Sequence, residues 1–347
     1  MHKRIIIEEA QNLSNALYID MRSPAEFSIG HIFGAINIPL FSDEERAEVG
    51  TIYKKVGAEQ ATELGLSIAS KKLPTIVSEI KVLSKTGRPI IIYCWRGGMR
   101  SKSIVTILNL LGIGVSQLIG GYKAYRRYIL DSLLTYKIHP KIILLCGSTG
   151  VGKTTILQLL EQKNIPVINL EKLANHRGSV FGQVGLGKST TAQSFDESIL
   201  MALNTFNTEP YIVLECESKR IGNIYLPDCL YQAMSIGTKI LIYADMETRI
   251  TRLITEYRDL NEENSKEIIL SMKALSKRFG TKKMEKLLSD FSQGEIRSVV
   301  GTLLVDYYDP LYGYDNMDTN NYQITINSND LEQASFQLIN YLEGLRR

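Results

Sequence analysis

The chain has 347 residues, which at roughly 150 residues per domain predicts two domains, each long enough to bury a core. Hydrophobic residues make up 44% and charged residues 22%, and no apolar run approaches the roughly 18 residues that span a bilayer, which excludes a membrane protein. The four cysteines include no CxxC pair, which excludes a disulfide framework and a zinc site, and the net charge of +3 does not by itself indicate nucleic acid.

The first predicted elements surround a cysteine. The basic start of the chain is followed by an apolar patch too short for a signal peptide, so we expect a cytoplasmic protein. Residues 17–20 predict a short strand, and the Ser-Pro pair at 23–24 predicts the start of a helix. Residues 89–93, PIIIY, predict a buried strand, and residues 101–111 have helical periodicity. Cys94 therefore lies where a strand is followed by a helix.

The turn after this strand, CWRGGMRS, has the chemistry of an anion site. Gly97 and Gly98 permit a tight turn, whose backbone N–H groups, with the positive end of the helix, favour an anion and a thiolate. Arg96 and Arg100 add two cations. A cysteine at a strand end is often just a small buried residue, but two nearby arginines disfavour that interpretation. The Cys-x5-Arg spacing from Cys94 to Arg100 also matches a phosphatase loop, which leaves that alternative open.

The residues before this loop resemble a rhodanese domain. The pattern consists of Asp20, Arg22, Glu26, Phe27, Gly30, His31, Gly34, Ala35, Asn37 and Pro39. The resemblance implies a rhodanese-like domain over residues 1–130 in which Cys94 carries sulfur or selenium, and it makes sulfur or selenium chemistry more probable than phosphatase chemistry. We interpret Asp20, Arg22 and His31 as structural residues and not as catalytic ones.

The second domain, expected over residues 138–347, begins with a strand and a P-loop, GSTGVGKT. Its phosphate-binding residues are Gly147, Gly150, Gly152, Lys153 and Thr154. The loop N–H groups would wrap a diphosphate, Lys153 would neutralise its charge, and Thr154 would contact a magnesium ion where one is bound. Strand candidates at 166–171, 210–215 and 238–245 alternate with helical stretches, which predicts an α/β fold: a P-loop NTPase-like parallel sheet.

Three further residues are weaker site candidates. Glu215 ends a predicted strand, where P-loop proteins often place a carboxylate, although it also suits the start of a helix. Arg177 and Arg220 lie in the polar, glycine-bearing loops at 174–182 and 215–227, and such loops usually carry function. The remaining cysteines, Cys146, Cys216 and Cys229, are expected in the core.

Two segments are candidates for contact with RNA. Residues 273–286 carry six cations in fourteen residues, several at helical spacing, which is a concentrated positive field or a solvated helix face. Residues 120–128, GGYKAYRRY, combine cations with tyrosines and are interpreted first as a solvated linker helix and second as a tRNA contact. Tyr307, Tyr308 and Tyr312 are candidates for stacking on a base, or for the core.

Taken together, the rhodanese pattern, the CWRGGMRS loop, the P-loop, HRGS, ESKRIG and YYDPLY make nearly the full chain resemble the tRNA 2-selenouridine synthases. The resemblance implies a transferase that acts on tRNA with 2-thiouridine at the wobble position, in lysine, glutamate and glutamine acceptors. It would first alkylate the sulfur with geranyl diphosphate and then replace that sulfur by selenium from selenophosphate. Alkylation activates the base, because an S-alkylated sulfur departs more easily from C2 than a thiocarbonyl sulfur.

The resemblance also implies roles for the two loops. Cys94 would carry selenium while Arg96, Gly97, Gly98 and Arg100 hold selenophosphate. The P-loop would hold the diphosphate of the geranyl donor, with Arg177 and Arg220 helping Lys153 to stabilise the leaving group. We expect no tightly bound cofactor, possible use of magnesium, a monomer, and an enzyme that supplies selenophosphate.

Two other classes of function are compatible with the residues. One is a rhodanese-type sulfurtransferase with an ATP-using regulatory P-loop domain. The other is a regulatory module in which Cys94 senses oxidants and the P-loop domain switches on nucleotide binding. The complete cysteine loop and the intact Lys153–Thr154 pair argue against a protein without catalytic activity.

Overall fold

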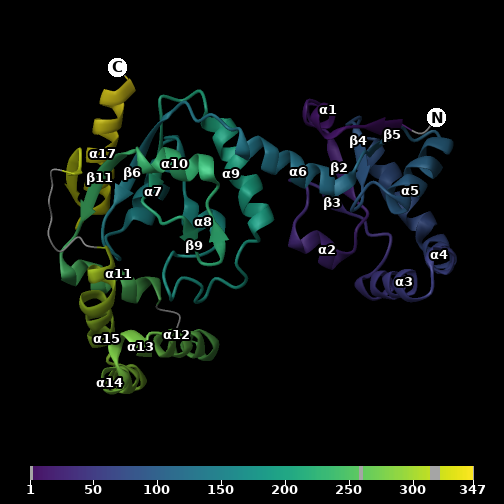
Figure 1. The fold of residues 1–347 in the computed structure, drawn as a ribbon. Helices are drawn as coiled ribbons and strands as arrows, with labels where there is room; N and C mark the ends of the chain where they lie inside the picture. The colour runs from purple at the N-terminus through teal and green to yellow at the C-terminus, as the bar shows by residue number, and fades with distance from the viewer. Residues whose placement is uncertain (1–2, 258–260, 313–320, 347) are drawn as a thin grey trace. The chain divides into compact units, whose positions relative to one another are not determined.

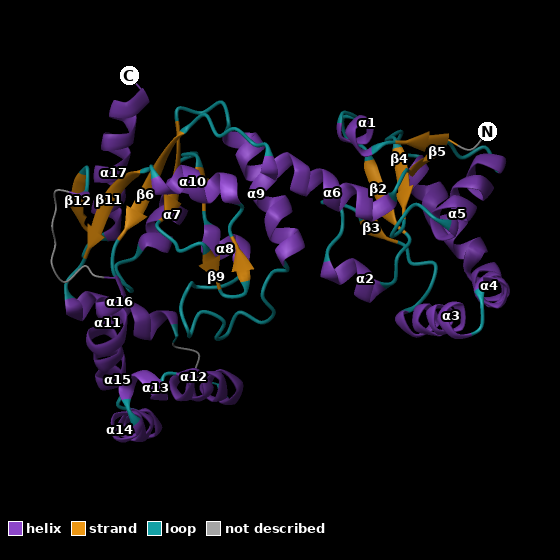
Figure 2. Cartoon of the chain, viewed as in Figure 1, coloured by secondary structure: helices purple, strands orange, loops and turns teal. Residues whose placement is uncertain are grey.

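The structure is a computed structural model that describes residues 3–257, 261–312 and 321–346. The chain forms two compact units, Met1–Leu133 and Leu134–Arg347. Figures 1 and 2 show a sheet with flanking helices in each unit. No described helix is long and apolar enough to span a membrane.

The first unit is built on a parallel five-stranded sheet. Its strands are β1 (Lys3–Ile5), β2 (Leu17–Asp20), β3 (Ile36–Asn37), β4 (Ile90–Tyr93) and β5 (Val115–Leu118). They lie in the order β1-β5-β4-β2-β3, with every pair parallel. β2 and β4 are fully buried, which is typical of parallel strands covered on both faces. The predicted strands at 17–20 and 89–93 are confirmed, and β4 ends directly before the cysteine loop.

Six helices surround this sheet. They are α1 (Ile7–Gln11), α2 (Pro24–Ile29), α3 (Asp43–Lys55), α4 (Ala58–Ser84), α5 (Met99–Leu110) and α6 (Gly121–Leu134). α2 begins at Pro24 because Ser23 and Glu26 form a capping box, which confirms the predicted helix start. β2, β4, α4 and α5 contribute the central apolar cluster of this unit. The packed cluster fixes the end of β4 and the start of α5, and the cysteine loop joins them.

The second unit contains a second parallel sheet. Its strands are β6 (Lys141–Cys146), β7 (Val167–Ile168), β8 (Tyr211–Glu215), β11 (Thr238–Tyr243) and β12 (Ile324–Asn327), and a separate hairpin pairs β9 (Arg220–Ile221) with β10 (Ile224–Tyr225). The order β12-β11-β6-β8-β7 is parallel throughout, as predicted. β6 lies at the centre, so the P-loop that follows it opens at the carboxyl end of the sheet. Ligands bind at this edge in open α/β sheets.

Helices cover this sheet and extend beyond it. They are α7 (Lys153–Gln162), α8 (Leu170–Ala174), α9 (Ala192–Phe206), α10 (Asp228–Ser235), α11 (Met246–Glu256), α12 (Glu262–Ala274), α13 (Ser276–Phe279), α14 (Thr281–Ser292), α15 (Ile296–Leu303), the π-helical turn η1 (Leu304–Tyr308), α16 (Asp309–Tyr312) and α17 (Leu331–Arg346). α7 and α17 pack on one face of the sheet. Figure 1 shows α12 to α15 beyond the end of the sheet where α11 begins, and their apolar residues form a separate cluster.

Candidate active sites

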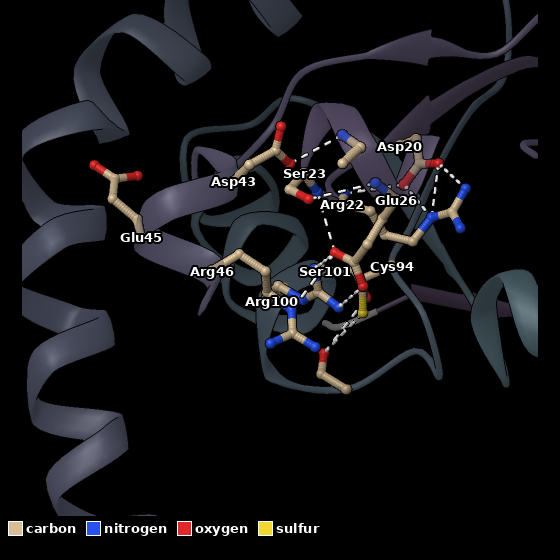
Figure 3. Close-up of polar contacts among 12 residues, drawn as sticks. Asp20, Arg22, Ser23, Glu26, Asp43, Glu45, Arg46, Cys94, Arg100 and Ser101 are labelled. Atoms are coloured by element: carbon tan, nitrogen blue, oxygen red, sulfur yellow. Dashed lines mark hydrogen bonds and ion pairs between the residues drawn. The ribbon is translucent and has the colours of Figure 1, made fainter. Parts of the chain in front are cut away.

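The Cys94 sulfur is buried at the end of β4, and its side chain is only 3% exposed. Its Sγ lies 3.2 Å from the hydroxyl of Ser101, which is on the first turn of α5 (Figure 3). The amide of Gln117 donates to this hydroxyl over 2.9 Å and to the carbonyl of Gly97 over 2.8 Å. The Ser101 hydroxyl also donates to the carbonyl of Gly98 over 3.4 Å, and because Gln117 occupies an acceptor position of the Ser101 oxygen, the hydroxyl proton can point at either the Gly98 carbonyl or the sulfur. Ser101 is therefore positioned to stabilise a thiolate, a role that sequence reasoning missed.

The start of α6 contacts the cysteine loop through backbone hydrogen bonds. Backbone N–H groups of Tyr122 and Lys123 donate to the carbonyls of Cys94 and Trp95 over 2.8 and 2.9 Å. This close approach requires glycine at residue 121, which has φ +58°, since a Cβ there would lie 2.1 Å from the Cys94 carbonyl oxygen. The segment at 120–128, interpreted from sequence as a linker helix or an RNA contact, thus supports the cysteine loop.

A Gly121→Ala substitution is expected to destabilise the first unit by about 1–3 kcal/mol, because the added Cβ displaces the cysteine loop and strains a left-handed backbone. Trp95, the single tryptophan of the chain, lies in that loop, so its fluorescence during urea unfolding reports the change. Gly114→Ala is the matched control, since a Cβ at Gly114 meets no atom within 4 Å. Equal unfolding midpoints for the two variants would contradict the expected clash.

The two arginines of the loop differ in their surroundings. Arg96 is exposed and makes no hydrogen bond or ion pair within the described part of the chain, so its charge is available to an anion. Arg100 donates to both carboxylate oxygens of Glu26 over 2.6 and 3.3 Å (Figure 3). Burial acts to raise the pKa of Glu26, but the contact with Arg100 outweighs it and the pKa is lowered. An anion bound at Arg100 would therefore share it with an ionised carboxylate.

Asp20 and Arg22 form a fully buried ion pair behind the loop. The Arg22 guanidinium donates to both oxygens of Asp20 and to the carbonyl of Gly30 over 2.6 Å. It also lies over the rings of Tyr122 and Trp95, with its Cζ 4.0 and 5.8 Å from the ring centroids. With its donors used in this way, Arg22 serves to hold the aromatic side chains around the loop, which agrees with its interpretation as a structural residue.

The P-loop of the second unit has the geometry expected for a phosphate cradle. Gly150 and Gly152 have φ of +83° and +91°, and a Cβ on Gly147 would lie 2.2 Å from the carbonyl oxygen of Ile242. Glycine is thus required at these positions. The Lys153 ammonium donates to the carbonyls of Gly147 and Ser148 over 2.7 and 3.4 Å, so it lies across the loop where phosphate oxygens bind.

A buried ion pair between Arg249 and Asp309 supports the P-loop. Arg249 on α11 donates from Nε to the carbonyl of Thr149 over 2.9 Å, and its terminal nitrogens lie 3.0 and 2.5 Å from the carboxylate of Asp309. The neighbouring Arg252 donates to the carbonyl of Val151 over 2.9 Å. Asp309 belongs to the YYDPLY motif, so this motif contributes to the site by helping Arg249 to hold the P-loop in position. Sequence reasoning considered only the tyrosines of this motif.

Three carboxylates lie beside the P-loop. Glu171 accepts the hydroxyl proton of Thr154 over 3.1 Å, and Glu215 accepts the backbone N–H of Glu171 over 2.7 Å. Burial raises the pKa of Glu215 to about 8 and that of Glu217 to about 7, and it also raises the pKa of Glu171. One oxygen of Glu215, Oε2, has no hydrogen-bond partner among the residues that the structure describes. The E-x-E spacing at the end of β8 was the sequence signal for this cluster, of which only Glu215 was predicted.

Protonation of Glu215 makes the stability of the second unit depend on pH. The unfolded carboxyl releases its proton near pH 4.3 and the folded one near pH 8, so between these values the native state binds more protons than the unfolded state. Stability should fall as the pH rises through this window, by up to about 1.4 kcal/mol per pH unit. Glu215→Gln, which keeps the acceptor for the N–H of Glu171, is expected to flatten the slope in urea unfolding between pH 5 and 8. The exposed Glu285→Gln is the control, and an unchanged slope in Glu215→Gln would refute the assignment.

The remaining sequence candidates differ in where they lie. Arg177 is ion-paired with Glu256 over 2.7 Å and lies over the ring of Tyr257, near the carboxylates. Arg220 is exposed on the β9–β10 hairpin, where it donates to the carbonyl of Gly222, and it makes no contact with the P-loop among the described residues. Cys146 is buried as expected, whereas Cys216 and Cys229 are only half-buried. The expectation that all three lie in the core is therefore wrong for two of them.

The basic segment at 273–286 does not form one helix. It runs from the end of α12 through α13 into α14: α12 ends at its C-cap, Leu275, and Gly280, which has φ +77°, ends α13 before α14 begins. All six cations are exposed: Lys273, Lys277, Arg278, Lys282, Lys283 and Lys286. Lys283 pairs with Asp306 over 2.7 Å, and Arg278 lies over the ring of Tyr307. Tyr307 and Tyr308 are buried, which leaves them unable to stack on a base, and the side chain of Tyr312 lies outside the described residues.

These two units define the class of the protein: a rhodanese-like domain with a buried loop cysteine, followed by a P-loop domain of α/β fold. Family models agree, since that of the rhodanese-like domain matches residues 6–128 and that of the tRNA 2-selenouridine synthase AAA domain matches residues 140–340. The chain belongs to the tRNA 2-selenouridine synthase family.

Similar proteins cover almost the whole chain. The tRNA 2-selenouridine synthase of Hydrogenovibrio crunogenus is 33% identical over 87% of this chain and 90% of its own length. The enzyme of Hahella chejuensis is 33% identical over 87% of this chain and 86% of its own, and that of Shewanella denitrificans is 32% identical over 85% and 87%. Membership of this family makes the chain an enzyme of tRNA modification.

Proposed function

We propose that this enzyme converts wobble-position 2-thiouridine in tRNA to 2-selenouridine in two steps. In the first step the thiocarbonyl sulfur attacks C1 of geranyl diphosphate, the C–O bond breaks and diphosphate leaves. In the second step the Cys94 thiolate takes selenium from selenophosphate as the P–Se bond breaks and phosphite leaves. The Cys94-bound selenium attacks C2, and the alkylated sulfur departs as geranyl thiol. A second thiol then attacks the Cys94 sulfur and breaks the S–Se bond, which leaves selenium on C2 and Cys94 in a mixed disulfide. One chain would thus perform both transfers, each with its own anion site.

The observation that carries this proposal is the presence of two complete anion sites of different chemistry. The first has a nucleophilic sulfur, Cys94, with the exposed cation Arg96 two residues away. The second has no nucleophilic cysteine in its loop, and its N–H groups and Lys153 suit a diphosphate leaving group. The first site therefore suits selenophosphate and the second suits the prenyl donor, with Thr154 as the residue that would contact a magnesium ion.

The exposed cations of α12 to α14 support an RNA substrate. Six of them lie in one short segment, and phosphate contacts by lysine and arginine supply most non-specific affinity for nucleic acids. We propose this segment as part of the tRNA surface. Affinity for tRNA should then fall steeply as salt is raised. The enzyme would act as a monomer in the cytoplasm, with selenophosphate delivered by the enzyme that makes it.

The experiment that tests this function is mass spectrometry of nucleosides from thiolated tRNA incubated with the full chain. Geranyl diphosphate alone should give S-geranyl-2-thiouridine, and both donors together should give 2-selenouridine. Unmodified 2-thiouridine in the presence of both donors would overturn the proposal. Sulfur transfer from thiosulfate to cyanide, with ATP hydrolysis in the absence of tRNA, would instead support a sulfurtransferase regulated by ATP.

A further inference from the structure

An apolar cavity of about 240 Å³ adjoins the P-loop of the second unit. Its walls come from α11, α12, α14, α15 and η1, together with Thr149 of the P-loop itself and the loop at 179–181. Apart from the hydroxyls of Thr149, Ser179 and two tyrosines, the lining side chains are aliphatic, aromatic or thioether groups. The cavity therefore offers almost no hydrogen-bond partner to whatever occupies it.

This lining selects a hydrocarbon and rejects a nucleotide base. A buried purine would leave its ring nitrogens and amino group without partners, at a cost for each unsatisfied group. No charged side chain is among the lining residues, so an anion would also be unpaired there. The volume is below the roughly 300–1,000 Å³ of pockets for drug-sized ligands, which suits a short apolar chain.

The cavity and the phosphate cradle share one wall. The side chain of Leu253, which lines the cavity, lies 3.3 Å from the position of a Cβ on Gly150 in the P-loop, and Thr149 belongs to both sites. A ligand that occupies both sites has a diphosphate head and a hydrocarbon tail. The far wall is formed by α14, because α14 packs on α15, and α15 in turn packs on α11 beside the P-loop. Phe291 is the residue of α14 that lines the cavity.

We propose that this cavity binds the tail of the prenyl diphosphate donor and that Phe291 limits the length of the tail. The inference rests on the proposed function, since it takes the donor of the first step to be a prenyl diphosphate. The P-loop then fixes the reacting C1 end, and the distance to α14 determines how many isoprene units fit. Thr149 and Ser179 supply the polar rim where the tail meets the diphosphate.

Competition between geranyl and the longer farnesyl diphosphate tests the length limit. With thiolated tRNA and the full chain, nucleoside mass spectrometry gives the ratio of farnesylated to geranylated product. Phe291→Ala is expected to raise this ratio by at least about 10-fold, because the shortened side chain opens the far wall. Phe336→Ala is the matched control, since Phe336 on α17 is 62% exposed and does not line the cavity.

A binding measurement tests the tail site without catalysis. Val300 on α15 is half-buried and lines the cavity, so Val300→Phe is expected to weaken binding of geranyl diphosphate by at least about 10-fold in calorimetry. Binding of inorganic diphosphate should remain unchanged, which shows that the P-loop is intact. Val305→Phe is the control, because Val305 is 55% exposed and lies outside the cavity.

The inference and the proposed function fail in different ways. Geranyl transfer by the wild-type enzyme, with an unchanged product ratio in Phe291→Ala and unchanged geranyl diphosphate binding in Val300→Phe, would overturn the inference alone. Absence of any prenyl transfer by the wild-type enzyme would overturn the proposed function. In that case calorimetry still tests whether the cavity binds the hydrocarbon tail. Equal affinities of the wild type for geranyl diphosphate and inorganic diphosphate would show that the tail adds nothing to binding, and would overturn the inference.

Discussion

Cys94→Ser is expected to abolish selenium incorporation, with a loss of at least about 10³-fold, and to leave geranylation intact. A hydroxyl has nearly the size of a thiol, so the buried contact with Ser101 persists. It is not ionised at neutral pH and does not accept selenium. With both donors present, S-geranyl-2-thiouridine should therefore accumulate in the tRNA, as measured by nucleoside mass spectrometry.

Cys229→Ser provides the control for this result. Cys229 is a half-buried cysteine of the other unit, and its removal should leave both products at the wild-type level. Continued formation of 2-selenouridine by the Cys94→Ser enzyme would show that selenium reaches C2 without passing through this thiol. Loss of both products would point to unfolding, which the fluorescence of Trp95 would detect.

Lys153→Ala is expected to reduce geranyl transfer by about 10²–10³-fold. The Lys153 ammonium lies across the P-loop, where it would neutralise charge that develops on the departing diphosphate. The same variant should convert tRNA that has already been geranylated to 2-selenouridine at the normal rate, because that step uses the cysteine loop. Separate assays with thiolated and with pre-geranylated tRNA measure the two rates.

Lys163→Ala controls for the loss of a lysine from the same element. Lys163 is exposed at the C-terminal end of α7, ten residues beyond Lys153, and should have no effect on either rate. A normal rate of geranyl transfer by Lys153→Ala would exclude this use of the P-loop. A reduced rate of both steps would indicate that the P-loop serves more than the prenyl donor.

Much of the fold was predictable, because it depends on local patterns. The apolar runs before Cys94 and Gly147 became the buried strands β4 and β6, and the Ser23-Pro24 pair became a capped helix start. At these positions the residues and their immediate neighbours in the chain determine the local secondary structure. The exception was the basic segment, which helical spacing alone would have made continuous but which is divided among three helices, with breaks at Leu275 and Gly280.

The candidate sites were predictable only in part, because their supporting residues come from distant parts of the chain. Ser101 on α5 contacts Cys94, Gln117 on β5 contacts Ser101, and Glu26 reaches Arg100 across 74 positions. Arg249 and Asp309 meet across 60 positions to hold the P-loop. Spacing in a sequence does not show such pairings, so the motifs located the chemistry while the contacts that orient it required the folded chain.

The wide turn η1 has a consequence for how the chain tolerates changes in length. Asp309 follows this turn directly, and its carboxylate meets Arg249 after a turn that holds one residue more than an α-helical turn would. Removing a single residue from 304–308 would rotate Asp309 by about 100° about the helix axis. Segment 304–309 therefore acts as a spacer of fixed length, and insertions or deletions in it should be far more harmful than substitutions at its exposed position Val305.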